Sequence, residues 1–294
     1  MDKFFTLDFG EKVGNKIDKE RLIREAYPRA EALLKKYSIK EESFRNIYGS
    51  MVDEDKKEVL GMKQSFSKDM DEKSLENNKL SEIFNAIALE QFEKNNWMGE
   101  EAFTTGTSEY DKLKTGISNI TEFHDEKGVS YMAMAVKVTF SSSLNKKLLK
   151  IKDNIKSGEL SKIKYFESEL HRGELKKVPS VIVGCEKDML LDVVELWLQK
   201  NNKALEKHPL QFLILDQIEE EIKFFKKEAS FSSNRELIKV YENIEKRIDG
   251  ILQQKKTIRE ELESPKEGDS LSFKENHDNV MSSLKVELES IFGD

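Results

Sequence analysis

The sequence predicts a mixed α/β fold, in which a small mixed β-sheet with a hairpin is flanked by helices and extended by long charged helices. Apolar residues recur at helical spacing through most of the 294-residue chain, as they do in amphipathic helices. Two β-rich runs near the middle of the chain are separated by a short polar connection, which favours an antiparallel hairpin. Charged residues make up 36% of the chain and hydrophobic residues 37%, a balance that favours helices with solvated faces.

Changes of pattern along the chain predict four segments. Residues 1–77 form a charged helical N-terminal extension, in which Pro28 is expected to divide or kink the first helix. Residues 78–205 form the α/β core, and residues 206–264 form a hairpin of two long amphipathic helices. Residues 265–294 combine a polar linker with a short terminal helix.

The core is expected to run helix, hairpin, helix, strand, strand, helix. The second of these helices ends at Gly158, a residue type that commonly stops helices. In order, the elements are SLENNKLSEIFNAIALEQFEKNNW, the strands GISNITEFH and VSYMAMAVKVTF, the helix SLNKKLLKIKDNIKSG, the strands KIKYFES and VPSVIVGC, and the helix KDMLLDVVELWLQKNN. The last strand is apolar enough for the interior of a sheet.

Composition and spacing exclude several classes of protein. The single cysteine, Cys185, cannot form an intramolecular disulfide, and we expect it to be a small buried side chain at the end of an apolar strand. The four histidines are scattered and give no zinc-ligand spacing. The longest apolar runs fall far short of the roughly 20 residues that span a bilayer, and acidic residues interrupt the N-terminus where a secretory signal would be apolar. We therefore expect a cytoplasmic protein with no membrane partner.

One basic segment stands out in an acidic chain. The net charge of −7 argues against a nucleic-acid footprint over the whole protein. Residues 144–178, however, contain ten Lys or Arg against five acids, a net of 10 − 5 = +5. Either this segment contacts the phosphates of DNA or RNA, or it is a solvated helix face. The candidate nucleic-acid-binding residues are Lys146, Lys147, Lys150 and Lys152.

The strand VSYMAMAVKVTFSS carries Lys137 near its middle, where a buried strand would have no charge. The stem of this lysine could pack while its ammonium reaches the sheet edge or pairs with Asp111. If residues 125–128 form the hairpin loop, Ser118 and Lys137 are diagonal neighbours about 7 Å apart on one face. Glu122 would then lie about 20 Å further along, too distant to share a site with Lys137.

The order helix, β-hairpin, helix, strand, together with SEYDKLKTGISNITEF and SYMAMAVKVTFSS, resembles the PD-(D/E)xK nuclease superfamily. The sequence of these segments is similar to that of an uncharacterised bacterial group within the superfamily, whose members tend to read Y-D-D, then N-G-V-D, then an apolar strand ending A-I-D-V-T. The resemblance covers about the middle of the chain. It implies a restriction-endonuclease-like core and Mg²⁺-dependent hydrolysis of phosphodiester bonds in nucleic acid.

In that superfamily, carboxylates on the two hairpin strands hold Mg²⁺, and a lysine two residues past the second acid orients the attacking water. A glutamate from the preceding helix often binds the metal as well. The resemblance implies Glu90 and Asp111 as metal ligands. It places Ser118 and Lys137 where the group tends to have aspartates, and Thr139 at the usual lysine position. Because Mg²⁺ requires clustered oxygen ligands and a lysine would repel it, we expect a lost or remodelled centre.

The two acids also have ordinary interpretations. Glu90 lies on the core-facing side of its helix, where a carboxylate needs a partner. Asp111 lies in a loop-like stretch, where acids are usually solvated.

Two functional hypotheses follow from the sequence, beside the third possibility of a self-contained structural domain that binds no ligand. The first is a degenerate Mg²⁺-dependent nuclease, with Asp111 and Lys137 as its catalytic residues. The second is a non-catalytic module on the same fold that binds nucleic acid or assembles with protein. In the second case the long C-terminal helices or the tail SLKVELESIF would engage a protein partner by laying a helix in a groove.

Overall fold

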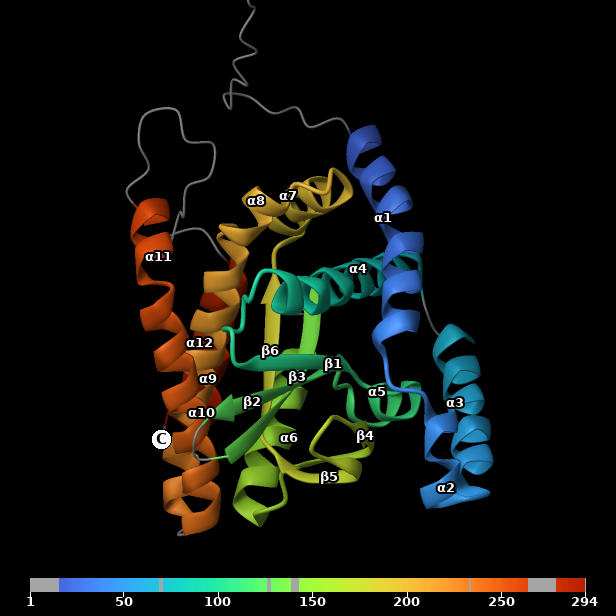
Figure 1. Cartoon of the computed structure of the whole chain (residues 1–294), viewed down its shortest axis with the longest axis vertical. Coiled ribbons are helices and arrows are strands. Elements are labelled where there is room, and N and C mark those ends of the chain that lie inside the picture. Colours follow the sequence, from blue (N-terminus) through green and yellow to red (C-terminus); the bar gives the residue numbers. More distant parts are fainter. Residues whose placement is uncertain are drawn as a thin grey trace, which may run out of the picture.

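The computed structural model describes residues 16–68, 71–125, 128–138, 143–232, 234–263 and 279–293 (Figure 1). The helices are α1 (Lys16–Tyr37), the 3-10 helix η1 (Glu41–Phe44), α2 (Arg45–Tyr48), α3 (Met51–Lys68), α4 (Glu72–Lys94), α5 (Glu109–Thr115), α6 (Ser143–Ser157), α7 (Lys187–Leu198), α8 (Asn202–Glu206), α9 (Leu210–Phe231), α10 (Arg235–Gln254), α11 (Lys256–Glu263) and α12 (Asn279–Phe292). The strands are β1 (Ala102–Gly106), β2 (Asn119–Asp125), β3 (Gly128–Val138), β4 (Ser161–Glu167), β5 (Arg172–Val178) and β6 (Ser180–Cys185).

In the described residues the strands form two sheets, and the predicted mixed α/β class is confirmed at that level. The larger sheet has the order β1-β2-β3-β6, with β1, β2 and β3 antiparallel and β6 parallel to β3. The smaller sheet pairs β4 with β5. In the hairpin, Asp125 pairs with Gly128 and Glu122 with Tyr131, so the register expected from the sequence is confirmed.

Side chains alternate between the two faces of the hairpin, as the pleat of a strand requires. Phe123, Met132 and Met134 belong to the main buried cluster, which includes the apolar residues of α4. The neighbours Ile120 and Ala133 instead join a second cluster with residues of β4 and β5. The larger sheet is therefore covered by helices on one face and by the smaller sheet on the other.

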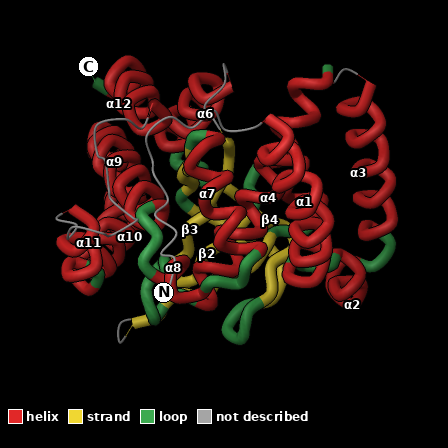
Figure 2. Tube along the Cα trace, turned by 90° about the horizontal axis from the view of Figure 1, so that it is seen from above, coloured by secondary structure: helices red, strands yellow, loops and turns green. Residues whose placement is uncertain are grey.

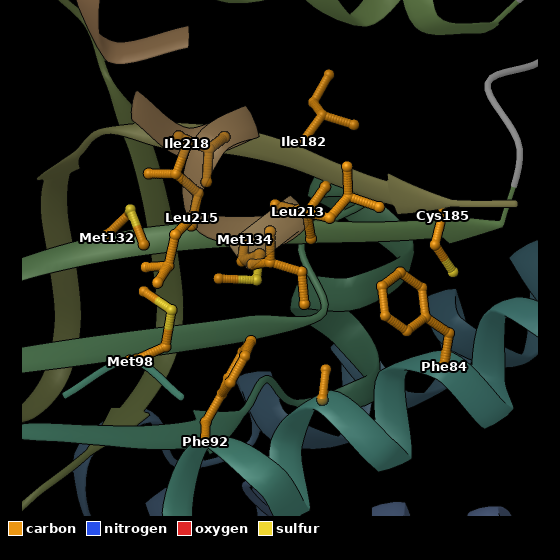
Figure 3. Packing of buried hydrophobic residues seen from close by; sticks show 14 of the residues in the cluster. Phe84, Phe92, Met98, Met132, Met134, Ile182, Cys185, Leu213, Leu215 and Ile218 are labelled. Carbon is orange, nitrogen blue, oxygen red and sulfur yellow. The ribbon is translucent and has the colours of Figure 1, made fainter. Parts of the chain in front are cut away.

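The main core lies between helices from distant parts of the chain. In Figure 3, Phe84 and Phe92 of α4 approach Met134 of β3 from one side, and Leu215 and Ile218 of α9 approach from the other. Each of these side chains is at most 1% exposed. Such packing of large side chains on two sides of Met134 holds β3 rigidly between α4 and α9.

Helix α9 covers the outer edge of β6. Gln217 accepts a hydrogen bond from the backbone N–H of Gly184 (2.7 Å) and donates one to its carbonyl oxygen (2.9 Å). One helical turn further, both carboxyl oxygens of Glu221 accept from the N–H of Ile182, at 2.9 and 3.1 Å. An open strand edge is a template for unwanted pairing, and these two side chains satisfy it from within the chain.

Helix α1 packs against α4 and α7, and Ala26 and Ala30 are fully buried there. The expectation that Pro28 divides this helix is wrong, because α1 is continuous from Lys16 to Tyr37 with the proline inside it. Proline removes one hydrogen bond from a helix interior, yet α1 remains helical on both sides of Pro28.

The main cluster draws on every predicted segment, including Ala26, Phe84, Ile218 and Leu288. The helices of the C-terminal part, α9 to α12, gather on one side of the molecule, and α1 to α4 lie on the other (Figure 2). The terminal helix α12 packs on α6 and α9, with Leu284, Leu288 and Phe292 buried. The apolar face of the predicted tail is thus used inside the chain. Within the described ranges, no helix is long and apolar enough to cross a membrane.

Candidate functional site

Glu90 of α4 joins three helices. Its side chain is 12% exposed. Its carboxylate accepts hydrogen bonds from Lys94 (2.6 Å) and from the indole N–H of Trp197, and it lies 3.6 Å from the guanidinium of Arg29. Burial alone would raise the pKa of Glu90, but the hydrogen bonds from Lys94 and Trp197 outweigh it and lower the pKa. The inward-facing carboxylate of Glu90 therefore has the partners that its burial requires, and these contacts link α4 to α1 and α7.

Asp111 is 2% exposed and lies on α5, so the expectation of a solvated acid in a loop is wrong. Ser108 caps this helix through the N–H of Asp111 and donates its hydroxyl to the carboxylate at 2.7 Å. The two carboxyl oxygens also accept the backbone N–H groups of Lys164 (2.8 Å) and Tyr165 (3.0 Å) of β4. Burial raises the pKa of Asp111, and these hydrogen bonds oppose the rise.

The two predicted metal ligands belong to separate networks. Glu90 is bound to α1 and α7, and Asp111 is bound to β4. In the part of the chain that the structure describes, no group of three or more His, Cys, Asp or Glu side chains could hold a metal ion. Because Mg²⁺ requires several oxygen ligands at one point, and because the oxygens of both acids are already engaged, these residues do not fit a magnesium centre.

Ser118 lies next to the hairpin as expected, but its backbone has a structural role. Its N–H donates to the carbonyl oxygen of Met134 at 2.8 Å, and its own carbonyl accepts from the N–H of Thr107 at 3.0 Å. The backbone of Lys137 lies on β3 opposite Gly184. The side chain of Lys137 and the whole of Thr139 lie outside the described part of the structure.

The structure separates the cations of residues 144–178 into two groups. Six of the ten form ion pairs with acids of the same chain. These six are Lys152, Lys156, Lys164, Arg172, Lys176 and Lys177. Among the residues described, Lys146, Lys150 and Lys162 have no ion-pair partner. The ammonium of Lys147 lies beside Gly116, where an added Cβ would approach it to 3.4 Å.

Lys152 differs from the other predicted nucleic-acid-binding lysines. Its ammonium donates to the carbonyl oxygen of Ile291, lies 3.8 Å from Glu228 and lies 5.4 Å from the ring centre of Phe292. All three contacts attach α6 to the C-terminal helices. We therefore assign Lys152 to the packing of α12.

A cavity of about 270 Å³ lies where α6 meets the beginnings of β4 and β6. Its lining residues are Thr115, Ile117, Lys147, Lys150, Ile151, Asn154, Glu159, Leu160, Ser161, Lys162, Ser180, Val181 and Ile182. Three lysines and one glutamate give the walls a net charge of 3 − 1 = +2. Gly116, with φ at 75°, ends α5 in the left-handed conformation and turns the chain toward β2 beside Lys147.

The cavity collects residues that sequence reasoning missed. Lys162, Asn154 and Glu159 were not predicted as site residues, although all three lie in the basic segment. Local charge could have pointed to that segment, but not to which of its side chains converge. Comparisons with protein-family models, with curated proteins and with solved structures found no match. They neither support nor contradict the resemblance to the PD-(D/E)xK superfamily.

Proposed function

We propose that this protein is a nucleic-acid-binding module on a nuclease-like α/β fold, and that it contacts phosphates through α6 and the start of β4. One observation carries the proposal. Most cations of the basic segment are neutralised by acids of the chain. Lys150 and Lys162, which have no ion-pair partner among the described residues, border one cavity together with Lys147. Lysines held near one another in this way attract phosphate.

The nuclease hypothesis has less support. Helix α4, the hairpin β2–β3, α6 and β6 follow one another in the order that the resemblance implies, with β1, α5, β4 and β5 inserted between them, but a fold alone does not establish a reaction. Glu90 and Asp111 are engaged in helix–helix and helix–strand contacts, and neither has an oxygen free to complete a metal site. Binding without cleavage at these acids therefore fits the geometry better.

Electrostatic attraction sets how such binding should behave. The whole chain has a net charge of −7, so the attraction for phosphates is confined to the surface around Lys150 and Lys162. Binding through that surface should be measurable at low salt. Each neutralised phosphate releases condensed counterions, which lowers the logarithm of the affinity by about 0.9 per tenfold rise in salt for duplex DNA and about 0.7 for single strands. A steep dependence of affinity on salt is thus the expected signature.

Reversing two charges at the cavity should abolish most of this binding. In the double variant Lys150→Glu, Lys162→Glu, we expect affinity for labelled DNA and RNA oligonucleotides to fall about tenfold or more in low salt, with a salt slope smaller by up to about 2. Neither lysine has an ion-pair partner among the described residues, so the fold should not change. Fluorescence anisotropy across a salt series measures both quantities.

Lys203→Glu is the matched control. Lys203 is an exposed lysine of α8, and α8 lies at the opposite end of the molecule from α6 (Figure 1). This variant should bind as the wild type does. No association of the wild type at low salt, or an equal loss in Lys203→Glu, would contradict the proposal. Cleavage that requires Mg²⁺ or Mn²⁺ and disappears in both Glu90→Gln and Asp111→Asn would favour the nuclease instead.

A further inference from the structure

The cavity beside α6 has more chemical variety than contact with a phosphate backbone requires. Besides its lysines it has aliphatic walls, formed in part by Ile117, Leu160 and Ile182, which are 1–5% exposed. It also has one carboxylate, Glu159, and one carboxamide, Asn154. A surface that only follows the backbone of a nucleic acid needs cations and nothing else.

Hydrogen bonds hold the walls of the cavity in place. The hydroxyl of Thr115 donates to the carbonyl oxygen of Asp111 at 2.6 Å. The hydroxyls of Ser161 and Ser180 bond to each other and join the beginnings of β4 and β6. By contrast, the side chains of Asn154 and Glu159 make no hydrogen bond or ion pair within the described part of the chain. Their polar atoms are available to a ligand.

The volume limits what can enter. At about 270 Å³ the cavity lies just below the range of about 300–1,000 Å³ typical of small-molecule pockets. It can take one group of nucleotide size, and a double helix cannot enter it. The net wall charge of 3 − 1 = +2 matches a phosphate monoester, which carries about −1.5 to −2 at pH 7. A phosphodiester within a strand carries only a single negative charge.

We propose that this cavity binds one nucleoside phosphate with a terminal phosphate group, as a free nucleotide or as the end of a single strand. The phosphate contacts Lys147, Lys150 and Lys162, and the sugar or base lies against the aliphatic wall. Glu159 accepts a hydrogen bond from a sugar hydroxyl or a base amino group, and Asn154 can donate or accept. The inference rests on the proposed function for the binding of strands, and adds that the cavity takes the terminal nucleotide.

The acidic residue makes the inference specific. Inorganic phosphate can approach Glu159 only with a charged group, whereas a nucleotide offers it a sugar hydroxyl or base amino group that lies apart from the charged phosphate. A nucleotide can contact the lysines through its phosphate and, at the same time, donate a hydrogen bond to the exposed carboxylate of Glu159, so nucleotides should bind more tightly than either inorganic phosphate or a nucleoside. Because a terminal phosphate carries more negative charge than a phosphodiester, a single strand with a terminal phosphate should bind more tightly than the same strand without one.

Calorimetry on the full chain tests these expectations with AMP, GMP, CMP and UMP, with adenosine and with inorganic phosphate. We expect the tightest-binding of the four mononucleotides to bind about tenfold or more tightly than phosphate or adenosine, because a hydrogen bond to a charged group contributes about 1.5–3 kcal/mol. Anisotropy with single-stranded oligonucleotides, each with and without a terminal phosphate, tests the strand end. The variant Lys150→Glu, Lys162→Glu should lose both activities.

Glu159→Ala separates recognition of the nucleotide from simple attraction of anions. Removal of this carboxylate should strengthen the binding of inorganic phosphate, but the preference for nucleotide over phosphate should fall about tenfold. The general change in cavity charge cancels from that ratio. Glu169→Ala removes an exposed acid of the same segment that lies outside the cavity lining, and it should leave the ratio unchanged.

Each outcome decides one of the two proposals. Binding of long oligonucleotides with no mononucleotide binding and no preference for a terminal phosphate overturns the cavity inference and leaves the proposed function standing. Mononucleotide binding that depends on Glu159, without any binding of strands, supports the cavity inference and overturns the proposed function. Mononucleotides that bind no more tightly than inorganic phosphate overturn the inference, whatever the strands do.

Discussion

Replacement of Asp111 by alanine is expected to lower the free energy of unfolding by about 2–6 kcal/mol. The side chain is 2% exposed and accepts the backbone N–H groups of Lys164 and Tyr165. Alanine would leave both donors unsatisfied, at a cost of about 1–3 kcal/mol each. It would also remove the acceptor of the Ser108 hydroxyl at the start of α5. Urea unfolding followed by circular dichroism measures the change.

Asp111→Asn is the matched control for this prediction. Asparagine keeps one oxygen that can accept one of the two N–H groups, so its loss of stability should be clearly smaller than that of alanine. A residue that served only as a metal ligand would behave differently, since neither change would then affect unfolding in the presence of a chelator. An unfolding free energy for Asp111→Ala within about 0.5 kcal/mol of wild type, the range of an ordinary surface substitution, would exclude the structural role.

The parts of the fold that depend on residues close together in the sequence were predicted from local sequence patterns. The register of the β2–β3 hairpin follows from a short polar connection between two alternating runs, and the structure has that register. The end of α6 was predicted from Gly158, which adopts φ of 71° after the last helical residue. A glycine adopts that conformation without the steric cost that other residues meet, so the sequence marks the position directly.

Pairing between distant strands was not predictable in the same way. Strand β5, with the sequence RGELKKV, has mostly charged residues, and only its pairing with β4 makes it a strand. Strand β1 is short and rich in threonine, and it is held by a hydrogen bond between Thr104 and Thr121 of β2. The runs KIKYFES and VPSVIVGC were both predicted as strands, but β4 and β6 belong to different sheets. Propensity describes single segments, and partners are chosen by tertiary packing.

The candidate site shows the same division between local and distant effects. The sequence singled out a basic segment that contains Lys147 and Lys150, both of which border the cavity. It could not show that Lys152 is engaged by Ile291, which lies 139 residues further along the chain. It also could not show that Asp111 is buried under β4. Charge composition locates a segment, and only the fold decides which of its charges are already neutralised.

The carboxyl group of Glu221 provides the second large effect. This side chain is fully buried and accepts the N–H of Ile182 at the edge of the larger sheet. Glu221→Ala should lower the free energy of unfolding by about 2–4 kcal/mol, because it leaves that N–H unsatisfied and opens a cavity between α9 and β6. Glu221→Gln retains an acceptor oxygen in the same place but cannot ionise, so it is the matched control variant for the charge of this carboxyl group.

Burial raises the pKa of Glu221 well above its usual value of 4.5. In the folded protein Glu221 therefore keeps its proton at pH values where the same side chain in the unfolded chain has lost it. The stability that this group contributes is fully present below about pH 4.5 and is lost as the pH rises through the folded pKa. Glutamine does not titrate, so the stability of Glu221→Gln relative to wild type should increase steadily as the pH rises from 5 to 8. Urea unfolding of both proteins at each pH measures this difference, from which the titration of all other shared groups cancels. Two results would contradict this prediction: a difference that stays constant over that range, or a Glu221→Gln variant as unstable as Glu221→Ala. Either would show that the buried carboxyl is ionised in the folded protein, and that its charge as well as its acceptor oxygen holds α9 against β6.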